Sequence, residues 1–223
     1  LHGSHGKGER PKGSRMVLGA NVVAKVEGKS EKTIVITGHI DHLGIINGKI
    51  YNGADDDASG TAALLAIADY FQRNPPNHTL IFAAVDGEEI GSPGAKYLLQ
   101  NFPGGKENIV LNVNMDMIAH NDKELYACGM FHYPELKAIN SAIESPNQIS
   151  FGHDDPGDKT KDDWTNSSDH RVFHLAGIPF MYFGVEDHED YHRPTDTYEN
   201  INPDFFIEAV KVIIKAIENF DNA

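Results

Sequence analysis

The sequence predicts an α/β protein, a three-layer αβα sandwich built around a mixed, mainly parallel central sheet. Two observations lead to this fold class. Segments that are apolar along their whole length alternate with segments that carry apolar residues at helical spacing. Fully apolar strands are typical of parallel sheets that are covered by helices on both faces. The 223 residues, 40% of them hydrophobic and 23% charged, are enough for one globular domain with a sizeable core.

The first half of the chain supplies three expected strands and one long helix. Residues 21–27 and 32–39 are rich in β-branched residues and are joined by the turn Gly-Lys-Ser-Glu, which predicts two strands. Residues 58–73 carry apolar side chains at helical spacing, and the following Asn-Pro-Pro-Asn ends this helix. The apolar run at residues 79–86 predicts the third strand.

The second half continues the alternation. Its expected elements are a helix at 92–101, a strand at 108–117, helices at 134–145 and 168–177, a strand at 178–185 and a final helix at 203–220. A long polar loop is expected from about residue 146 to residue 167. The final helix is apolar on more than one face, so we expect it to be largely buried.

Charge and composition disfavour some classes of partner. Acidic residues number 33 against 19 basic ones, and the formal charge of −14 argues against nucleic acid or anionic membrane, because both reward clustered Lys and Arg. No apolar run is long enough to span a bilayer. Residues 1–18 are interpreted as a flexible arm or linker, and residues 19–223 as a single domain. Cys128, the only cysteine, lies in an apolar stretch and is expected to be a small core residue.

Side chains that can bind metal or carry protons follow four of the predicted strands. They are His39, Asp41 and His42 after the second strand, Glu88 and Glu89 after the third, Asp116 at the end of the fourth and His192 beyond the fifth, together with Asp55, Asp56 and Asp57 before the first helix. In open α/β sheets, ligands bind outside the carboxyl ends of the strands. These side chains are therefore expected to meet at one edge of the sheet.

Each group also has a local structural explanation. The run from Asp55 to Asp57 could cap the following helix, and the pair of Glu88 and Glu89 could be a solvated turn. Asp116 is harder to explain in this way, because a carboxylate on a central strand is costly unless it is paired or bound to metal. A single site with two histidines and three carboxylates accounts for all the groups together. That ligand set suits two divalent ions, zinc first, with manganese or cobalt as substitutes.

Six motifs, taken in order, resemble the co-catalytic dizinc aminopeptidases of metallopeptidase family 28. They are GHIDHLG, GADDDASG, GEEIGSPGA, NMDM, SDHRVFHLAGIP and YHRPTDT, and the resemblance covers about residues 21–220. It implies that His39 and Asp116 hold one zinc ion and that Glu89 and His192 hold the other. Asp56 matches the bridging carboxylate of the family.

The resemblance also implies the remaining catalytic roles. Glu88 matches the general base that activates a metal-bridging water, while its neighbour in the chain binds metal. Asp41 matches the carboxylate that orients the imidazole of His39. Tyr191, directly before His192, is either a hydrogen-bond donor to the tetrahedral intermediate or an ordinary packing tyrosine.

The implied function is removal of N-terminal residues from peptides with a free amino end, and residues 19–223 would form the catalytic domain. The resemblance to this family also leads us to expect a secreted or periplasmic protein. One alternative is a glutaminyl-peptide cyclotransferase, which shares the fold but works with one zinc ion. Another is an inactive relative that serves as a binding module. The loop with Trp164 is either a wall of the substrate pocket or a plain surface loop. His170, His174 and His188 are not assigned as metal ligands.

Overall fold

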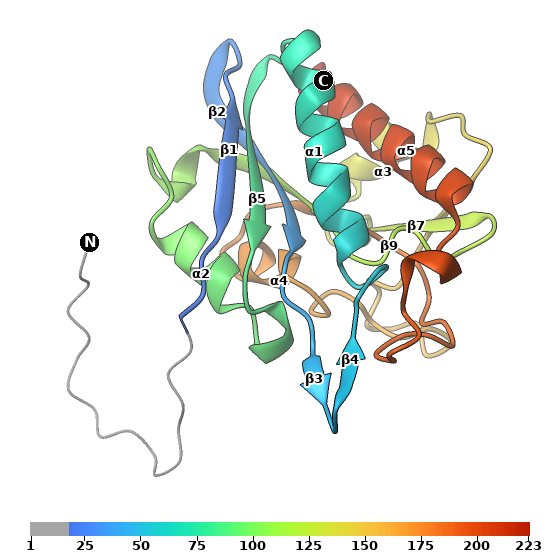
Figure 1. Ribbon diagram of the computed structural model, residues 1–223. Coiled ribbons are helices and arrows are strands. Elements are labelled where there is room, and N and C mark those ends of the chain that lie inside the picture. The colour runs from blue at the N-terminus through green and yellow to red at the C-terminus, as the bar shows by residue number, and fades with distance from the viewer. Residues whose placement is uncertain (1–17) are drawn as a thin grey trace.

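The computed structural model describes residues 18–223, so the arm expected at residues 1–18 lies outside the described residues except for Leu18. The strands of the main sheet are β1 Val22–Val26, β2 Ser30–His39, β5 His78–Val85, β6 Ile109–Met115, β7 Glu124–Cys128, β8 Gln148–Phe151 and β9 Phe180–Gly184. Their spatial order is β1-β5-β2-β6-β9-β7-β8 (Figure 1). β2 pairs in parallel with β5 and β6, and β6 with β9, whereas β1 and β7 run antiparallel to β5 and β9. The expected mixed, mainly parallel sheet is confirmed.

Five helices cover the two faces of this sheet. They are α1 Ala58–Arg73, α2 Pro93–Gln100, α3 Glu135–Ser141, α4 His170–His174 and α5 Pro203–Asp221. α1, α3 and α5 pack on one face, and α2 and α4 pack on the other (Figure 1). Because side chains alternate along a strand, Ile34 and Ile36 of β2 face the first group of helices and Val35 faces the second. The three-layer αβα arrangement follows from this division.

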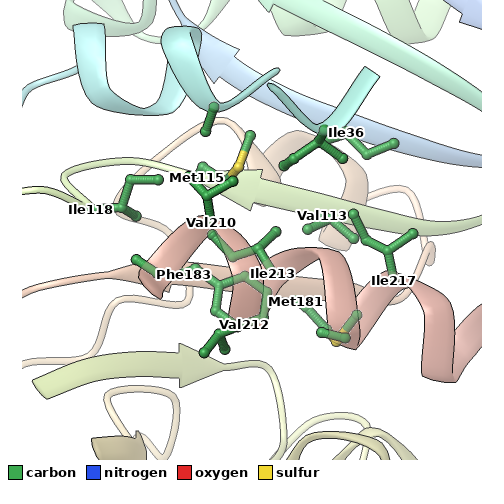
Figure 2. Close-up of a cluster of buried hydrophobic side chains, with 14 of the residues drawn as sticks. Ile36, Val113, Met115, Ile118, Met181, Phe183, Val210, Val212, Ile213 and Ile217 are labelled. Atoms are coloured by element: carbon green, nitrogen blue, oxygen red, sulfur yellow. The ribbon is translucent and has the colours of Figure 1, made fainter. Parts of the chain in front are cut away.

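The larger core lies between the sheet and α5. Figure 2 shows Met115 and Phe183 from the sheet beside Val210 and Ile213 from α5, and all four belong to one buried cluster. The helix buries one face only, and Ile207 on its other side remains 49% exposed. The expected burial of α5 is confirmed for its other aliphatic and aromatic residues, which are all buried or partly buried against this core. They lie on one broad face of the helix and not on several.

Four strands were not predicted from the sequence. β3 Gly44–Ile46 and β4 Lys49–Tyr51 form a separate two-stranded hairpin, and β7 and β8 extend the main sheet. β8 lies inside the segment expected to be a polar loop, which corrects that assignment. These strands are three to five residues long, and such short strands depend on pairing with a neighbour more than on a pattern of their own. Within residues 18–223, no helix combines the length and apolar character needed to cross a membrane.

Candidate metal centre and active site

The side chains predicted from the sequence meet at the carboxyl ends of β2, β5 and β6. His39 is the last residue of β2 and is paired in register with Val85, the last residue of β5. Asp116 follows β6 directly, where its backbone N–H donates to the carbonyl of Phe183 on β9. His192 reaches the same place from the segment that follows β9. The parallel pairing of the strands thus gathers residues that are far apart in the chain.

Asp56 lies between two histidines. Its Oδ1 is 3.1 Å from His39 Nε2, and its Oδ2 is 3.1 Å from His192 Nε2. Each histidine also faces a carboxylate of its own: Asp116 Oδ1 is 3.6 Å from His39 Nε2, and Glu89 Oε2 is 3.6 Å from His192 Nε2. The five residues therefore form two groups that share Asp56, which is the division that the resemblance implies.

This donor set fits a pair of metal ions. His39, Asp56 and Asp116 are only 1%, 4% and 7% exposed. Burial raises the pKa of Asp56, and the nearby charge of Asp116 adds to the effect, as expected where carboxylates crowd together. Buried carboxylates are costly unless cations balance them, and imidazole and carboxylate donors suit zinc. The residues present can hold two such ions.

His42 also lies at the site; the sequence analysis grouped it with the other strand-end side chains but assigned it no role of its own. Its Nδ1 is 2.9 Å from Glu89 Oε1 and 3.8 Å from Asp56 Oδ2. The two closer atoms do not meet with hydrogen-bond geometry, and within residues 18–223 neither has another hydrogen-bond partner. His42, Asp56 and Glu89 each offer an atom within 4.8 Å of the other two, so His42 could join a group that holds an ion. The only sequence signal for this position was the run His-Ile-Asp-His at the end of β2.

Asp41 supports both glutamates as well as His39. Its Oδ1 accepts a hydrogen bond from the backbone N–H of Glu88 at 2.9 Å, and its Oδ2 accepts one from Glu89 at 3.2 Å. His39 Nδ1 lies 3.0 Å from the backbone carbonyl of Asp41 and 3.6 Å from its Oδ1. The close partner of the imidazole is thus the backbone carbonyl of Asp41, whereas the resemblance implied its carboxylate. The contacts that fix the short 3-10 turn Glu88–Ile90 were not foreseen.

The three consecutive aspartates have different surroundings. Asp57 Oδ2 accepts from the backbone N–H of His39 and Oδ1 from that of Gly60, both at 2.9 Å, so this residue is the helix cap of α1. The peptide bond between Asp56 and Asp57 is cis. Asp196, which the sequence analysis did not single out, accepts from the backbone N–H of Asp56 at 3.2 Å. Capping therefore accounts for Asp57 and leaves Asp56 facing the histidines.

Glu88 is the carboxylate of the pair that has no close histidine contact. Its side chain lines the cleft, partly shielded from solvent. Burial raises its pKa to about 8, and the charge of Asp116 contributes to this rise. A nearby cation favours the ionised form of a carboxyl group. Glu88 is therefore placed to take up and release a proton near neutral pH.

A cleft of about 270 Å³ opens beside these residues. Its wall includes Asp163, Trp164 and Ser167, so the loop that follows β8 lines the cleft rather than an unrelated surface. Trp164 stacks on His153 with ring centroids 3.6 Å apart. Tyr191 also lines the cleft and stacks on the neighbouring metal-site histidine at 4.0 Å.

Two residues at the centre adopt a left-handed backbone conformation, which is strained for residues other than glycine. They are Met117, with φ of 60°, and His192, with φ of 53°. Strain of this kind persists where the surrounding structure enforces it, and it is concentrated at functional sites. Both residues lie directly at the ligand groups.

The histidines that received no metal in the sequence analysis have other contacts. His170 Nε2 is 2.9 Å from the carbonyl of Trp164, and burial lowers the His170 pKa to about 4, so its ring is neutral. His174 Nδ1 is 2.9 Å from the hydroxyl of Tyr133. His188 lies outside the centre, beside Asp55. Cys128 is fully buried, which confirms its interpretation as a core residue.

The parallel-rich sheet with this ligand set at its carboxyl edge defines the class of the protein, an α/β protein with the fold of zinc exopeptidases. The sequence profile of peptidase family M28 matches residues 21–217, and the chain belongs to that family.

Known proteins similar to this chain agree with the assignment. A probable zinc metalloprotease of Pyrenophora tritici-repentis is 36% identical over 150 residues, which cover 61% of this chain and 31% of that protein. The zinc aminopeptidase BSAP from Bacillus subtilis superimposes with a TM-score of 0.70 at 22% identity, covering 88% of this chain and 49% of that one. A glutaminyl cyclase from Fimbriiglobus ruber superimposes with a TM-score of 0.73 at 19% identity, covering 89% of this chain and 74% of that one. At these identities the two structures bear on the fold alone.

Proposed function

We propose that residues 19–223 form the catalytic domain of a dizinc aminopeptidase, which hydrolyses N-terminal residues from peptides. The observation that supports this most strongly is the position of Asp56 between His39 and His192, each of which has a carboxylate of its own. A shared carboxylate with two such groups suits a pair of divalent ions. Mn²⁺ or Co²⁺ would be substitutes with similar ligand preferences.

Zinc bound to these groups would lower the pKa of a shared water and polarise the scissile carbonyl. Glu88, which lines the cleft and has no close histidine contact, would accept a proton from the attacking water and donate it to the leaving amine. Asp41 holds the backbone of Glu88 at 2.9 Å and so fixes the direction of the carboxylate. Burial raises the pKa of Tyr191, which keeps its hydroxyl protonated as a donor to the oxyanion.

The cleft also supports a substrate with a free amino end. Three acidic side chains that are not assigned as ligands, Asp162, Asp163 and Asp187, line it together with the metal groups. A protonated N-terminus is favoured where carboxylates outnumber cations. An acetylated N-terminus would lose this attraction, so hydrolysis should depend on the free amine.

Glu88→Gln tests the proposed role of Glu88. The variant should lose activity by about 10²- to 10⁴-fold, the usual contribution of a general base, while its zinc content, measured by mass spectrometry, stays equal to that of the wild type. Activity that survives the substitution would show that another group moves the proton. Loss of zinc would instead place Glu88 among the ligands.

The likeness to a glutaminyl cyclase raises a second function with the same fold. That reading requires only one zinc ion, whereas both ligand groups are complete here. Release of ammonia from peptides that begin with glutamine, without cleavage, would favour the cyclase. The absence of both peptide cleavage and ammonia release would favour an inactive binding module.

A further inference from the structure

We propose that four buried polar side chains behind the metal centre position Asp116 through a chain of hydrogen bonds whose direction is fixed at every step. The members of this polar chain, in order, are Asn112, Thr37, Asn114 and Ser168. Its last member presents a hydroxyl proton to Asp116, which would hold one of the two metal ions. The inference rests on the proposed metal centre, and it gives a role to side chains that the mechanism does not use.

The register of the sheet places the polar chain next to the centre. β2 and β6 are neighbouring parallel strands in which Thr37 pairs with Asn114, and Asn112 lies two residues further back on β6. Side chains two residues apart on a strand point to the same face. His39 follows Thr37 by two residues, and Asp116 follows Asn114 by two. The polar chain therefore runs along one face of the sheet and leads to this histidine and this aspartate.

Burial makes the polar character of these positions informative. Three members of the polar chain are fully buried, and Ser168 is only 1% exposed. Buried polar groups are costly unless they are hydrogen-bonded, whereas a connected network fixes one arrangement of its members. Oδ1 of Asn112 has no hydrogen-bond partner among residues 18–223, so part of that cost remains. Apolar side chains would fill this face at lower cost, which points to a role other than packing.

A backbone carbonyl sets the direction of the hydrogen bonds at the far end of the polar chain. Nδ2 of Asn112 donates to the carbonyl oxygen of Val35 at 3.1 Å, and a carbonyl can only accept. A reversed amide would place two oxygens against each other, so Nδ2 of Asn112 also donates to Oγ1 of Thr37, at 3.0 Å. The single hydroxyl proton of Thr37 is then donated to Oδ1 of Asn114 at 2.5 Å.

The second half of the polar chain carries this direction to the metal centre. With its oxygen held by Thr37, Asn114 donates from Nδ2 to Oγ of Ser168 at 2.9 Å, just before α4. Oγ accepts in this contact, so its own proton is left to donate. Burial raises the pKa of Asp116, but the charge of His39 and hydrogen bonds from His39 and Ser168 hold this pKa below its ordinary value. The polar chain thus ends on a donor to a carboxylate that must stay ionised to bind metal.

Zinc binding by variants of Thr37 tests the polar chain. Thr37→Val keeps the shape of the side chain but removes the hydroxyl, so the amide of Asn114 loses the partner that sets its orientation. Metal-stripped full-length protein is dialysed against graded zinc, and bound zinc is counted by mass spectrometry. One of the two equivalents should be weakened by about 10- to 100-fold, the usual effect of losing an outer partner of a ligand. Thr37→Ser keeps the hydroxyl and should bind both equivalents as the wild type does.

The matched control is Thr33→Val, the same substitution on the same strand. Thr33 is also buried, but its hydroxyl donates to the backbone carbonyl of Glu31, outside the polar chain. Both variants lose a buried hydroxyl, so a general loss of stability would affect them alike. Only Thr37→Val should change the zinc affinity.

A double variant tests whether Thr37 acts through Ser168. Ser168→Ala removes the last hydroxyl of the polar chain and should weaken the same zinc equivalent. The double variant Thr37→Val with Ser168→Ala should then bind zinc no more weakly than Ser168→Ala alone. Independent effects at the two positions would instead add.

The outcomes separate the polar chain from the metal centre. The polar chain is overturned if Thr37→Val or Ser168→Ala binds both equivalents like the wild type, if Thr33→Val or Thr37→Ser loses as much as Thr37→Val, or if the two effects add. Wild-type protein that binds no zinc would overturn the proposed metal centre together with the polar chain. Circular dichroism shows that each variant is folded, and Thr37→Ala takes the place of Thr37→Val if that variant does not fold.

Discussion

Replacing Glu88 by glutamine should change how the stability of the metal-free protein depends on pH. Glutamine has the shape of a glutamic acid side chain but cannot ionise, so the variant represents the protonated form at every pH. In the metal-free wild type, burial and the charge of Asp116 raise the Glu88 pKa from its ordinary 4.5 to about 8. The Glu88→Gln substitution therefore tests the electrostatics of the metal centre through a single ionisable group.

The sign follows from proton uptake. Between pH 4.5 and about 8 the folded protein holds a proton on Glu88 that the unfolded chain has released, so the free energy of unfolding falls as pH rises through this window. The shift of 8 − 4.5 = 3.5 pH units corresponds to at most about 5 kcal/mol, at 1.36 kcal/mol per unit. The window from pH 5 to pH 8 covers 8 − 5 = 3 of these units, or at most about 4 kcal/mol. Structural relaxation and water entry reduce this, and we expect Glu88→Gln to gain about 1–3 kcal/mol on the wild type across this window.

Urea unfolding of both proteins in excess chelator, at pH 5, 6, 7 and 8, measures this gain. Glu144→Gln is the matched control, because Glu144 is exposed and outside the site, and its stability curve should follow the wild type. Parallel curves for Glu88→Gln and the wild type over the whole range would refute the reasoning. Bound zinc should abolish the difference, since a cation favours ionised Glu88.

Three further substitutions test other parts of the structure. Asp41→Ala removes the acceptors of two backbone N–H groups and should weaken zinc binding in dialysis by about 10- to 100-fold; unchanged affinity would remove its assigned role. Phe183→Ala empties a fully buried position and should lower the free energy of unfolding by about 3–5 kcal/mol in urea, and a loss under 1 kcal/mol would contradict the packing described. Asp221→Ala leaves the backbone N–H groups of Asn77 and His78 without their acceptor, and calorimetry should show a loss of about 1–3 kcal/mol at unchanged zinc content; a loss of zinc would show that this contact reaches the site.

The strongly patterned elements of the fold were predictable from the sequence. β5 is a nearly continuous apolar run, β2 has an apolar centre at residues 34–36, and α1 has a clear apolar face and a proline stop after it. Local composition and tertiary burial agree in these elements. β8 was missed because it is a four-residue edge strand with only partly buried residues, and its pairing with β7 supplies what its pattern lacks.

The sequence predicted which edge of the sheet holds the site. It did not predict all the contacts that individual side chains make there. The rule for strand ends brought His39 and Asp116 together, but the choice of Asp56 among three aspartates came from the family resemblance. The structure gives the physical reason, since Asp57 is committed to capping α1. The contacts of Asp196 with the aspartate run join residues about 140 positions apart, and no local pattern indicates them.

Mass spectrometry of a peptide panel tests the central claim most directly. Zinc-loaded protein would be incubated with peptides offered both with a free and with an acetylated N-terminus, some of them beginning with glutamine. The structure predicts stepwise loss of single residues from the free peptides only, because the cleft beside Glu88 and the two ligand groups is rich in carboxylates. Internal cleavage, or equal hydrolysis of acetylated peptides, would contradict an aminopeptidase. Ammonia release without cleavage would show that the protein acts as a glutaminyl cyclase instead.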